Sequence, residues 1–530
     1  MCTNIAKCFH KLHSNCCDFC FCFISKKFIV FTIILLCANA LANGFNIDVD
    51  SALIHRGPTG TYYGFSVAQH RDRGDSWLLV GAPLAESTQP GVSKGGAVYR
   101  CKSDAPNTCQ HILFDEKGIH RPATVPANGS YVQSEMKSNQ WFGATVSSSG
   151  ETGKIVACAP RYVYYSVSLK RREPVGMCFV STGSFIGIVP LEPCKKADEW
   201  GYHRLGSCQL GFSASISEDG RRLFMGAVGS YYWQGQVYSY NFENISSYQH
   251  TRESPPTEDD SYLGYSMTLG RFSADEEINV AVGMPKGSNL KGKVVIYTQN
   301  LMNVFNISGE QMGSYFGYSL AGADVNGDGL DDLVIGAPFY TPTSEKETGY
   351  EYGSITVAYQ KAKGRFEKSE LIVGRNSKGR FGMAVSKLGD VNKDGYQDIA
   401  VGAPYDGKFE SGAVYVFNGG ANGLKSKASQ VIYAEDLRES GLKTFGFSLS
   451  GGMDMDRNEY PDLLVGAYAS DRAIHLKARP IVHVDASFEL TPKNIGLDQK
   501  ACSLQDGTKV ACISANVCFN YSGINVESRM

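Results

Sequence analysis

The 530-residue sequence lacks a dominant sign of charge and, beyond its N-terminal region, lacks an apolar run long enough to span a bilayer. Its formal net charge is −2, which argues against nucleic acid as a partner. The one short basic run, Lys170-Arg171-Arg172, is expected to be an exposed hairpin tip or a protease-sensitive loop. The ten His residues are scattered and indicate no catalytic domain. The 58 glycines and the period-two patterning exclude a helical solenoid, because glycine is costly inside helices.

One short phrase recurs seven times in the sequence. An aromatic-Gly-aromatic turn is followed about twenty residues later by an apolar run that ends in Gly-Ala-Pro, as in 315–318 with 334–338 and 380–383 with 401–404. Each unit also carries a strand such as 412–416. The glycines that anchor the turns are Gly64, Gly143, Gly211, Gly264, Gly317, Gly382 and Gly446. Three or four short strands in a unit of roughly sixty residues are typical of one blade of a β-propeller.

The sequence therefore predicts an all-β fold in which residues 44–477 form a seven-bladed β-propeller. One Phe-Gly pair alone would be an ordinary turn, but seven in register define an architecture. Residues 478–530 are expected to begin a β-sandwich, with strands near 482–490 and 510–519, that cannot close by itself.

Residues 1–43 have the pattern of a secretory signal peptide with an extended leader. Lys26-Lys27 precedes the apolar run 28–36, and Ala38, Ala40 and Ala42 follow as an Ala-x-Ala-like cleavage site. The mature chain is expected to begin near Asn43. We interpret the many cysteines before residue 23 as part of this leader, and a signal anchor is the alternative interpretation.

Secretion favours disulfides over metal ligation for the other cysteines. Neighbours in the sequence suggest four pairs, Cys101–Cys109, Cys158–Cys178, Cys194–Cys208 and Cys502–Cys512. Cys518 is left over, and we expect its partner to have been lost with a missing C-terminal region. Asn-x-Ser glycosylation sites at Asn128, Asn244, Asn306 and Asn520 fit the same compartment.

Three successive units carry an acidic loop between the turn and the Gly-Ala run. Side-chain oxygens recur at positions 1, 3, 5 and 9, and a backbone carbonyl is available at position 7, which suits the six to eight oxygen ligands of Ca²⁺. The expected ligands are Asp324, Asn326, Asp328, Leu330 and Asp332; Asp390, Asn392, Asp394, Tyr396 and Asp398; and Asp454, Asp456, Asn458, Tyr460 and Asp462. The alternative is a set of solvated acidic turns, more so in the third loop, where Glu459 replaces a glycine. The three Ca²⁺ sites are expected to be structural, with no open position for catalysis.

These repeats and loops together resemble the head of an integrin alpha subunit. Segments 45–50, 229–236 and 477–481 are similar to the mature N-terminus, the third-blade signature and the exit into the thigh domain of that family. Blades two and three leave no room for an inserted domain between them, so the resemblance is to the insert-free class. Segment 271–277 of the fourth unit lacks the metal pattern, as in the alpha-four/alpha-nine branch and some insect alpha-PS subunits.

The resemblance implies a cell-adhesion receptor subunit and no enzyme. It would pair with an integrin beta subunit and bind an extracellular-matrix or cell-surface ligand in a divalent-cation-dependent way. The resemblance places Phe65, Trp141, Phe212, Tyr265, Tyr315, Tyr318 and Phe447 in a central cup that accepts a basic side chain of the beta subunit. Packing between blades is the alternative role of these rings. Ligand contact is expected at Tyr231, Tyr232, Trp233 and Gly235, with Tyr202 beside them.

A whole integrin alpha subunit continues through thigh and calf domains to a membrane-spanning helix, whereas this sequence ends at Met530, early in the thigh. We expect a short isoform, an incomplete sequence or a fragment, at the cell surface as a whole receptor or secreted as a soluble head or decoy. The rival interpretations are a secreted phospholipase with the same repeat and a purely structural calcium-stabilised propeller. Segment 73–76 spells Arg-Gly-Asp-Ser, a peptide that many integrins bind, but hairpin chemistry explains it.

Overall fold

The structure is a computed structural model. It describes residues 16–22, 46–118, 134–166, 170–196, 198–273, 277–343, 349–362, 364–491, 493–494, 496, 498–503 and 506–526. The chain forms two compact units, one of residues Ile47–Arg479 and one that combines Met1–Asn46 with Pro480–Met530. The larger unit extends two residues beyond the predicted boundary at Lys477, because strand β32 (Arg472–Ala478) continues through that lysine.

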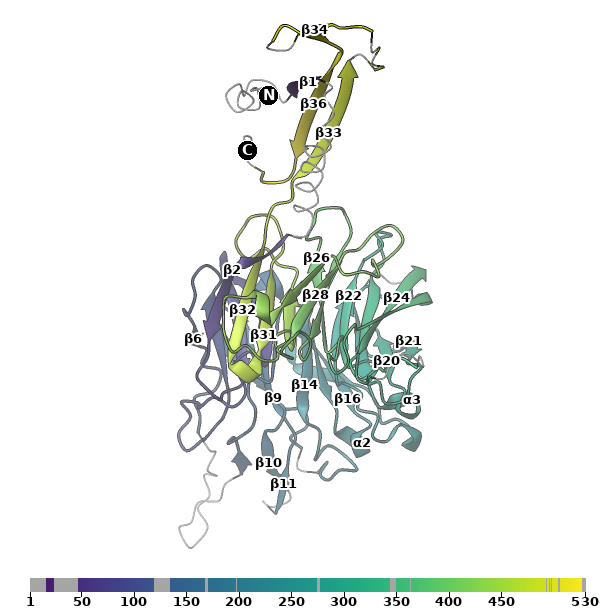
Figure 1. Cartoon of the computed structure of the whole chain (residues 1–530). Helices are drawn as coiled ribbons and strands as arrows, with labels where there is room; N and C mark the ends of the chain where they lie inside the picture. Colours follow the sequence, from purple (N-terminus) through teal and green to yellow (C-terminus); the bar gives the residue numbers. More distant parts are fainter. Residues whose placement is uncertain are drawn as a thin grey trace. The chain divides into compact units, whose positions relative to one another are not determined.

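The larger unit consists mainly of seven four-stranded antiparallel sheets, the seven predicted blades (Figure 1). The first three blades contain β3 (Ser66–Asp72), β4 (Asp75–Ala82), β5 (Ala97–Lys102) and β6 (Gln110–His111); β8 (Thr145–Ser148), β9 (Ile155–Ala159), β12 (Met177–Gly183) and β13 (Ile186–Leu191); and β14 (Leu210–Ile216), β15 (Arg222–Ala227), β16 (Gln236–Asn241) and β17 (Asn244–His250).

The next three blades repeat this order of four strands. They contain β18 (Met267–Gly270), β19 (Asn279–Met284), β20 (Lys293–Tyr297) and β21 (Asn303–Ser308); β22 (Ser319–Ala323), β23 (Asp332–Ala337), β24 (Ser354–Ala362) and β25 (Arg365–Val373); and β26 (Ala384–Gly389), β27 (Asp398–Ala403), β28 (Ala413–Phe417) and β29 (Gln430–Tyr433). Blade seven has β30 (Ser448–Gly451), β31 (Leu463–Ala467) and β32.

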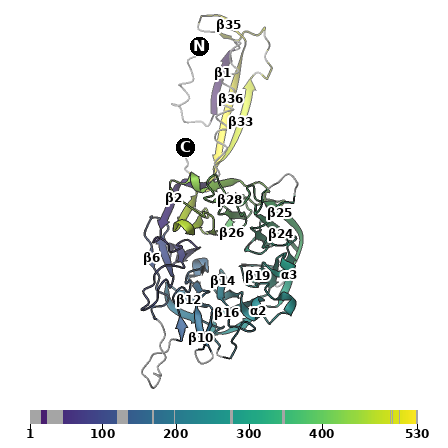
Figure 2. The ribbon, with the colours of Figure 1, turned by 60° about the horizontal axis from the view of Figure 1, so that its bottom comes forward.

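Strand β2 (Ile47–Arg56) completes the seventh blade and closes the ring. It comes from the start of the larger unit and pairs antiparallel with β32 near its end. The first strand of every blade contacts the first strand of the next, and β30 contacts β3 in the same way. Figure 2 shows the blades following one another around this ring.

The repeated glycines are required where neighbouring blades meet. All seven turn glycines have φ between 84° and 96°, a backbone conformation that other residues adopt only with strain. The glycine of each Gly-Ala run then lies against the turn of the next blade. A Cβ on Gly402 would lie 1.9 Å from the carbonyl oxygen of Gly446, and one on Gly336 would lie 2.2 Å from that of Gly382. The two glycines of the repeated motif are therefore required for the close packing of neighbouring blades.

Short elements lie outside the blades. A three-stranded sheet of β7 (Glu135–Met136), β10 (Val163–Ser166) and β11 (Arg171–Glu173) extends from blade two and carries the basic run Lys170–Arg172 on its exposed edge. The helical turns are η2 (Gly150–Thr152), α2 (Ser230–Trp233), η3 (Pro256–Glu258), α3 (Gly287–Leu290), η4 (Ala434–Asp436) and η5 (Tyr468–Ser470). In the part of the chain that the structure describes, no helix has the length and apolar character needed to cross a bilayer.

The smaller unit is built around the pair β33 (His483–Thr491) and β36 (Cys512–Ser522), with β34 (Cys502–Ser503) and β35 (Lys509–Val510) beside it. Val484, Phe488 and Phe519 lie on one face of this pair and are more than half exposed. An amphipathic sheet of this kind needs a second layer to bury its apolar face, as expected for the start of a sandwich.

Two features of the smaller unit differ from the sequence-based prediction. Residues Cys16–Cys22, which we assigned to a leader, form strand β1 and pair antiparallel with β36, with Cys16 opposite Cys518. Cys518, which we expected to have no partner, is disulfide-bonded. The prediction matched each cysteine with a neighbouring cysteine in the sequence and therefore missed β1. Its alternating Cys and Phe residues suit a strand as well as a leader.

Candidate functional site

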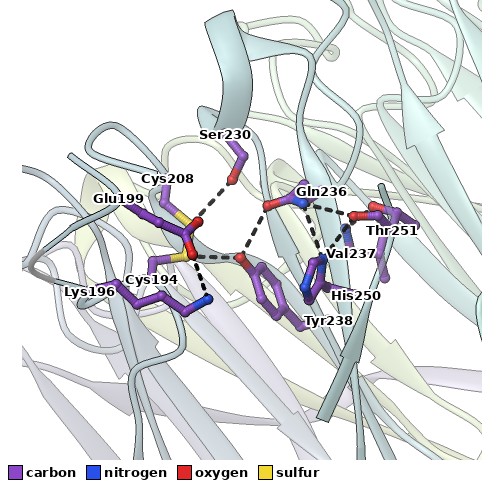
Figure 3. Close-up of a disulfide and its surroundings, with 10 residues drawn as sticks. All are labelled: Cys194, Lys196, Glu199, Cys208, Ser230, Gln236, Val237, Tyr238, His250 and Thr251. Carbon is purple, nitrogen blue, oxygen red and sulfur yellow. Dashed lines mark hydrogen bonds and ion pairs between the residues drawn. A yellow bond between two sulfur atoms is a disulfide. The ribbon is translucent and has the colours of Figure 1, made fainter. Parts of the chain in front are cut away.

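The four predicted disulfides all form, and one of them holds the loop before the third blade. The pairs are Cys101–Cys109, Cys158–Cys178, Cys194–Cys208 and Cys502–Cys512. Around Cys194–Cys208, the Ser230 hydroxyl donates to Cys208 Sγ at 3.3 Å, and Tyr238 Oη lies 3.5 Å from Cys194 Sγ (Figure 3). This buried disulfide ties the loop to the turn that follows β15.

An exposed aromatic cluster lies on that loop and turn. Tyr202 is 57% exposed and Tyr232 is 40% exposed, and their ring centroids are 5.4 Å apart. The Trp233 ring is stacked on Tyr202 at 6.3 Å. The backbone fixes the pair as well, because the Tyr232 N–H donates to the Tyr202 carbonyl at 2.7 Å. The structure thus brings three of the predicted ligand-contact residues together on the surface.

The other two predicted ligand contacts have different roles. Tyr231 is half-buried and packs on the core beneath the turn. Gly235 is buried, and a Cβ there would lie 2.1 Å from the Leu263 carbonyl oxygen in the next blade. We therefore reassign Gly235 from ligand contact to packing between blades.

The turn that carries this cluster is left-handed. Tyr231, Tyr232 and Trp233 have φ of 47°, 54° and 59°, and blade four repeats the turn with Ser288, Asn289 and Leu290 at 51°, 57° and 66°. The backbone shape therefore belongs to the fold, whereas the aromatic side chains at these positions are present in the third blade and absent from the fourth. The fold does not require an exposed tyrosine here, which makes Tyr232 a candidate for binding.

The predicted cup residues lie in two groups of touching rings. Phe65 contacts Trp141 at 5.5 Å and Phe447 at 5.2 Å between ring centroids, which joins blades one, two and seven. In the second group the Tyr265 ring contacts each of the other three, Phe212 at 4.8 Å, Tyr318 at 5.2 Å and Tyr315 at 6.1 Å between ring centroids. All seven rings are half-buried. They contact across blades and also keep an open side, so both proposed roles remain compatible with the geometry.

Sequence reasoning missed several members of this cup. Tyr468 lies 4.4 Å from Phe447, and Phe339 lies 5.4 Å from Tyr315. The Arg380 guanidinium lies 5.1 Å from the Phe339 ring and 5.0 Å from the Tyr405 ring. Phe339, Tyr405 and Tyr468 directly follow their Gly-Ala or Gly-Ala-Pro runs, a signal that could have identified them.

The three acidic loops share one hydrogen-bond pattern. The position-9 carboxylates, Asp332, Asp398 and Asp462, are fully buried. In each loop one oxygen of this carboxylate accepts a hydrogen bond from the backbone N–H at position 2. The other oxygen accepts from a backbone N–H at or near the end of the blade's third strand. In the second loop, the two donors to Asp398 are Val391 and Gly419. The position-1 carboxylate accepts from N–H groups at positions 5 and 6. The rings at the repeat turns of the cup come just before or at the start of the first strand of their blades, whereas the acidic loops come just after it. The loops and the cup therefore lie at opposite ends of the strands.

These loops fit a divalent cation. Burial is the main cause that raises the pKa of Asp332 and that of Asp398 to about 7, and neighbouring loop carboxylates add to the effect. In the third loop, carboxylate oxygens of Asp454, Asp456 and Asp462 lie within 4.8 Å of one another. Crowded, buried carboxylates favour a bound cation, which would remove their mutual repulsion.

Other sequence motifs have structural explanations. Arg73 and Gly74, both at positive φ, form the two-residue turn between β3 and β4, and Arg457 donates to the Gly74 carbonyl. The Arg-Gly-Asp sequence thus forms a hairpin turn, as expected. Asn244, Asn306 and Asn520 are exposed, whereas Asn128 lies outside the described residues.

Comparison with known proteins identifies the family. The FG-GAP repeat matches residues 316–357 and 381–417, and Integrin alpha Ig-like domain 1 matches residues 478–530. Integrin alpha-PS2 of Drosophila melanogaster is 43% identical over 93% of this chain and 38% of its own length. The chain belongs to the integrin alpha family. Integrin alpha-8 and integrin alpha-V of Gallus gallus are 39% and 38% identical, over 94% and 93% of this chain.

The chain spans less than half the length of these integrin alpha relatives, 38–48% of each. The similarity to alpha-PS2 agrees with the predicted resemblance to insect alpha-PS subunits. The family resemblance, the all-β fold and the FG-GAP repeats predicted from the sequence are confirmed.

Proposed function

We propose that the chain forms the head of a cell-adhesion receptor, without enzymatic activity of its own. The head would pair with an integrin beta subunit and bind an extracellular-matrix or cell-surface protein. Integrin alpha relatives are adhesion receptors, which supports this assignment over the phospholipase alternative. We further propose entry into the secretory pathway, in line with the disulfides and the N-terminal signal pattern.

The observation that carries the proposal is the relation of the aromatic cluster to the cup. The Tyr262 N–H donates to the Trp233 carbonyl at 3.0 Å, and Tyr262 lies three residues before Tyr265 of the cup. The cluster and the cup therefore lie at the same edge of the blades. A basic side chain of the beta subunit would enter the cup and contact its rings. A ligand could then contact Tyr202, Tyr232 and Trp233 beside the joint.

We propose a structural role for Ca²⁺ in the three acidic loops. Each loop would hold one ion, and the three loops are Asp324–Asp332, Asp390–Asp398 and Asp454–Asp462. The ion would neutralise the loop carboxylates, at the ends of the strands opposite the cup. The shared hydrogen bonds of the position-1 and position-9 carboxylates hold each loop in a closed turn that suits such an ion.

The test is co-expression of the full chain with an integrin beta subunit in medium with Ca²⁺ and Mg²⁺. A stable heterodimer should be secreted and should bind plates coated with basement-membrane extract. Tyr232→Ala should weaken this binding tenfold or more and leave the heterodimer yield unchanged, as is typical of an exposed aromatic anchor. Asn289→Ala, at the equivalent position of blade four, is the control and should change neither. Loss of both properties in Tyr232→Ala would instead assign the residue to the core.

A further inference from the structure

The third acidic loop differs from the other two in its immediate surroundings. All three loops have three carboxylates and one amide at positions 1, 3, 5 and 9. In the first two loops the amide is at position 3 and donates to the carboxylate at position 5, as Asn392 does to Asp394 at 2.8 Å. In the third loop Asp456 takes position 3 and Asn458 takes position 5. The position-3 group is therefore charged only in the third loop.

A lysine faces this position-3 carboxylate. Lys477 Nζ lies 3.4 Å from Asp456 Oδ2, and Lys477 directly precedes the residue whose N–H donates to Asp462. The residues at the same place in blades five and six, which carry the first two loops, are Tyr359 and Asn418, and neither carries a positive charge. Among the residues that the structure describes, no Lys, Arg or His side chain forms an ion pair with the carboxylates of the first two loops.

We propose that Lys477 is a built-in counter-ion that gives the third loop a weaker affinity for Ca²⁺ than the first two loops have. This inference rests on the proposed calcium role of the loops. The number of charged ligands is one of the features that set calcium affinity in oxygen-rich loops. Lys477 neutralises one of three carboxylates and repels an incoming divalent cation. At the effective dielectric constant of a protein surface, a charge at this distance lowers the affinity by about tenfold or more.

The weaker site would lie where the chain leaves the propeller. Asn458 Nδ2 donates to the Ala478 carbonyl at 2.7 Å, and the Ala478 N–H donates to Asp462 Oδ1 at 2.9 Å. Ala478 is the last residue of β32, and the larger unit ends one residue later. Two proposed ligand residues therefore hold the last residue of the last strand directly. Calcium in the third loop would stabilise this end of the propeller only at concentrations at which the other loops are already filled.

Equilibrium dialysis of the full chain with radioactive Ca²⁺ tests the inference. The wild-type chain should bind two ions tightly and a third at least about tenfold more weakly. Asp454→Ala should remove only the weak phase. Lys477→Met should bring the third site into the tight class, whereas Lys477→Arg should keep it weak. Lys361→Met is the matched control and should leave the isotherm unchanged, because Lys361 lies in β24, outside the acidic loops, and its Nζ pairs with Glu367 Oε2 at 3.7 Å.

The outcomes separate this inference from the calcium proposal. Three equal sites in the wild-type chain, or a Lys477→Met isotherm that superimposes on the wild-type one, would overturn the role of Lys477 and leave calcium binding in place. Binding of no Ca²⁺ to any loop would overturn both. The melting temperature and circular dichroism of each variant check that it has folded.

Discussion

The hydroxyl of Ser448 donates a 2.9 Å hydrogen bond to the carbonyl oxygen of Gly64, which lies 384 residues away in the sequence. Ser66 makes the same bond to Gly143 at 2.8 Å, and Ser266 makes it to Gly317 at 2.7 Å. The closing joint between the seventh and first blades therefore uses the same contact as the internal joints. The same serine-to-glycine hydrogen bond therefore connects neighbouring blades along the chain and closes the propeller.

This joint predicts a large cost for a single added methyl group. A Cβ on Gly466 would lie 2.1 Å from the Gly64 carbonyl oxygen, so Gly466→Ala should lower the free energy of unfolding by about 1–3 kcal/mol. Gly420→Ala, where the nearest atom is 3.7 Å away, is the control and should be close to neutral. Urea unfolding of both variants measures the difference. Equal stability of the two variants would contradict the proposed packing at the joint.

Chelation should destabilise the propeller. Because Ca²⁺ would bind only folded loops, saturating calcium should raise the free energy of unfolding by about 2.7 kcal/mol for each site filled at a hundred times its dissociation constant. EDTA should therefore lower the melting temperature, and added Ca²⁺ should restore it. Asp398→Asn should reduce the effect, because it neutralises a fully buried carboxylate of the second loop. A melting curve that is the same with and without EDTA would argue against structural calcium.

The buried imidazole of His70 predicts a loss of stability in mild acid. Burial lowers the pKa of His70 from 6.5 to about 4, and among the described residues only Ser148 is within hydrogen-bond distance of its ring, at Nδ1. Between these two pH values the unfolded chain binds the proton and the folded chain does not. The His70 contribution is complete above pH 6.5 and is lost as the pH falls toward 4, by up to about 1.4 kcal/mol per pH unit.

His70→Asn should flatten this dependence, while His203→Asn on the Tyr202 loop should keep it. Urea titrations between pH 4 and 7 give the required free energies of unfolding. Parallel pH profiles for wild type and His70→Asn would show that another group controls the acid sensitivity.

The local parts of the fold and site could be predicted from the sequence. Each of the first six blades, each acidic loop and each of the four predicted disulfides uses residues that are close in the chain, such as Cys101 and Cys109. The left-handed φ values of Tyr62, Trp141 and Tyr315, two residues before their repeat glycines, follow from the same repeated turn. These local features could be predicted because the same sequence motif occurs in several blades, so that each copy supported the others.

Contacts that depend on how separate strands and turns pack could not be predicted in this way. The two residues Lys477 and Asp456 belong to different strands and loops, and only the pairing of β31 with β32 brings them together. Arg380 contacts Phe339 and Tyr405 from two other turns. The closing strand β2 and the strand β1 depend on partners more than 400 residues away. Such pairings depend on tertiary structure, which no local pattern specifies.

The most direct test of the account is assembly of the heterodimer through the aromatic cup. Phe447 contacts both Phe65 and Tyr468, at 5.2 and 4.4 Å, and is the centre of one group of cup rings. Size-exclusion chromatography of the full chain co-expressed with an integrin beta subunit should show a stable complex in Ca²⁺ and Mg²⁺. Phe447→Ser should reduce its yield at least tenfold, while Tyr232→Ala keeps it. A wild-type chain that remains monomeric in the presence of the beta subunit would contradict the receptor-head assignment.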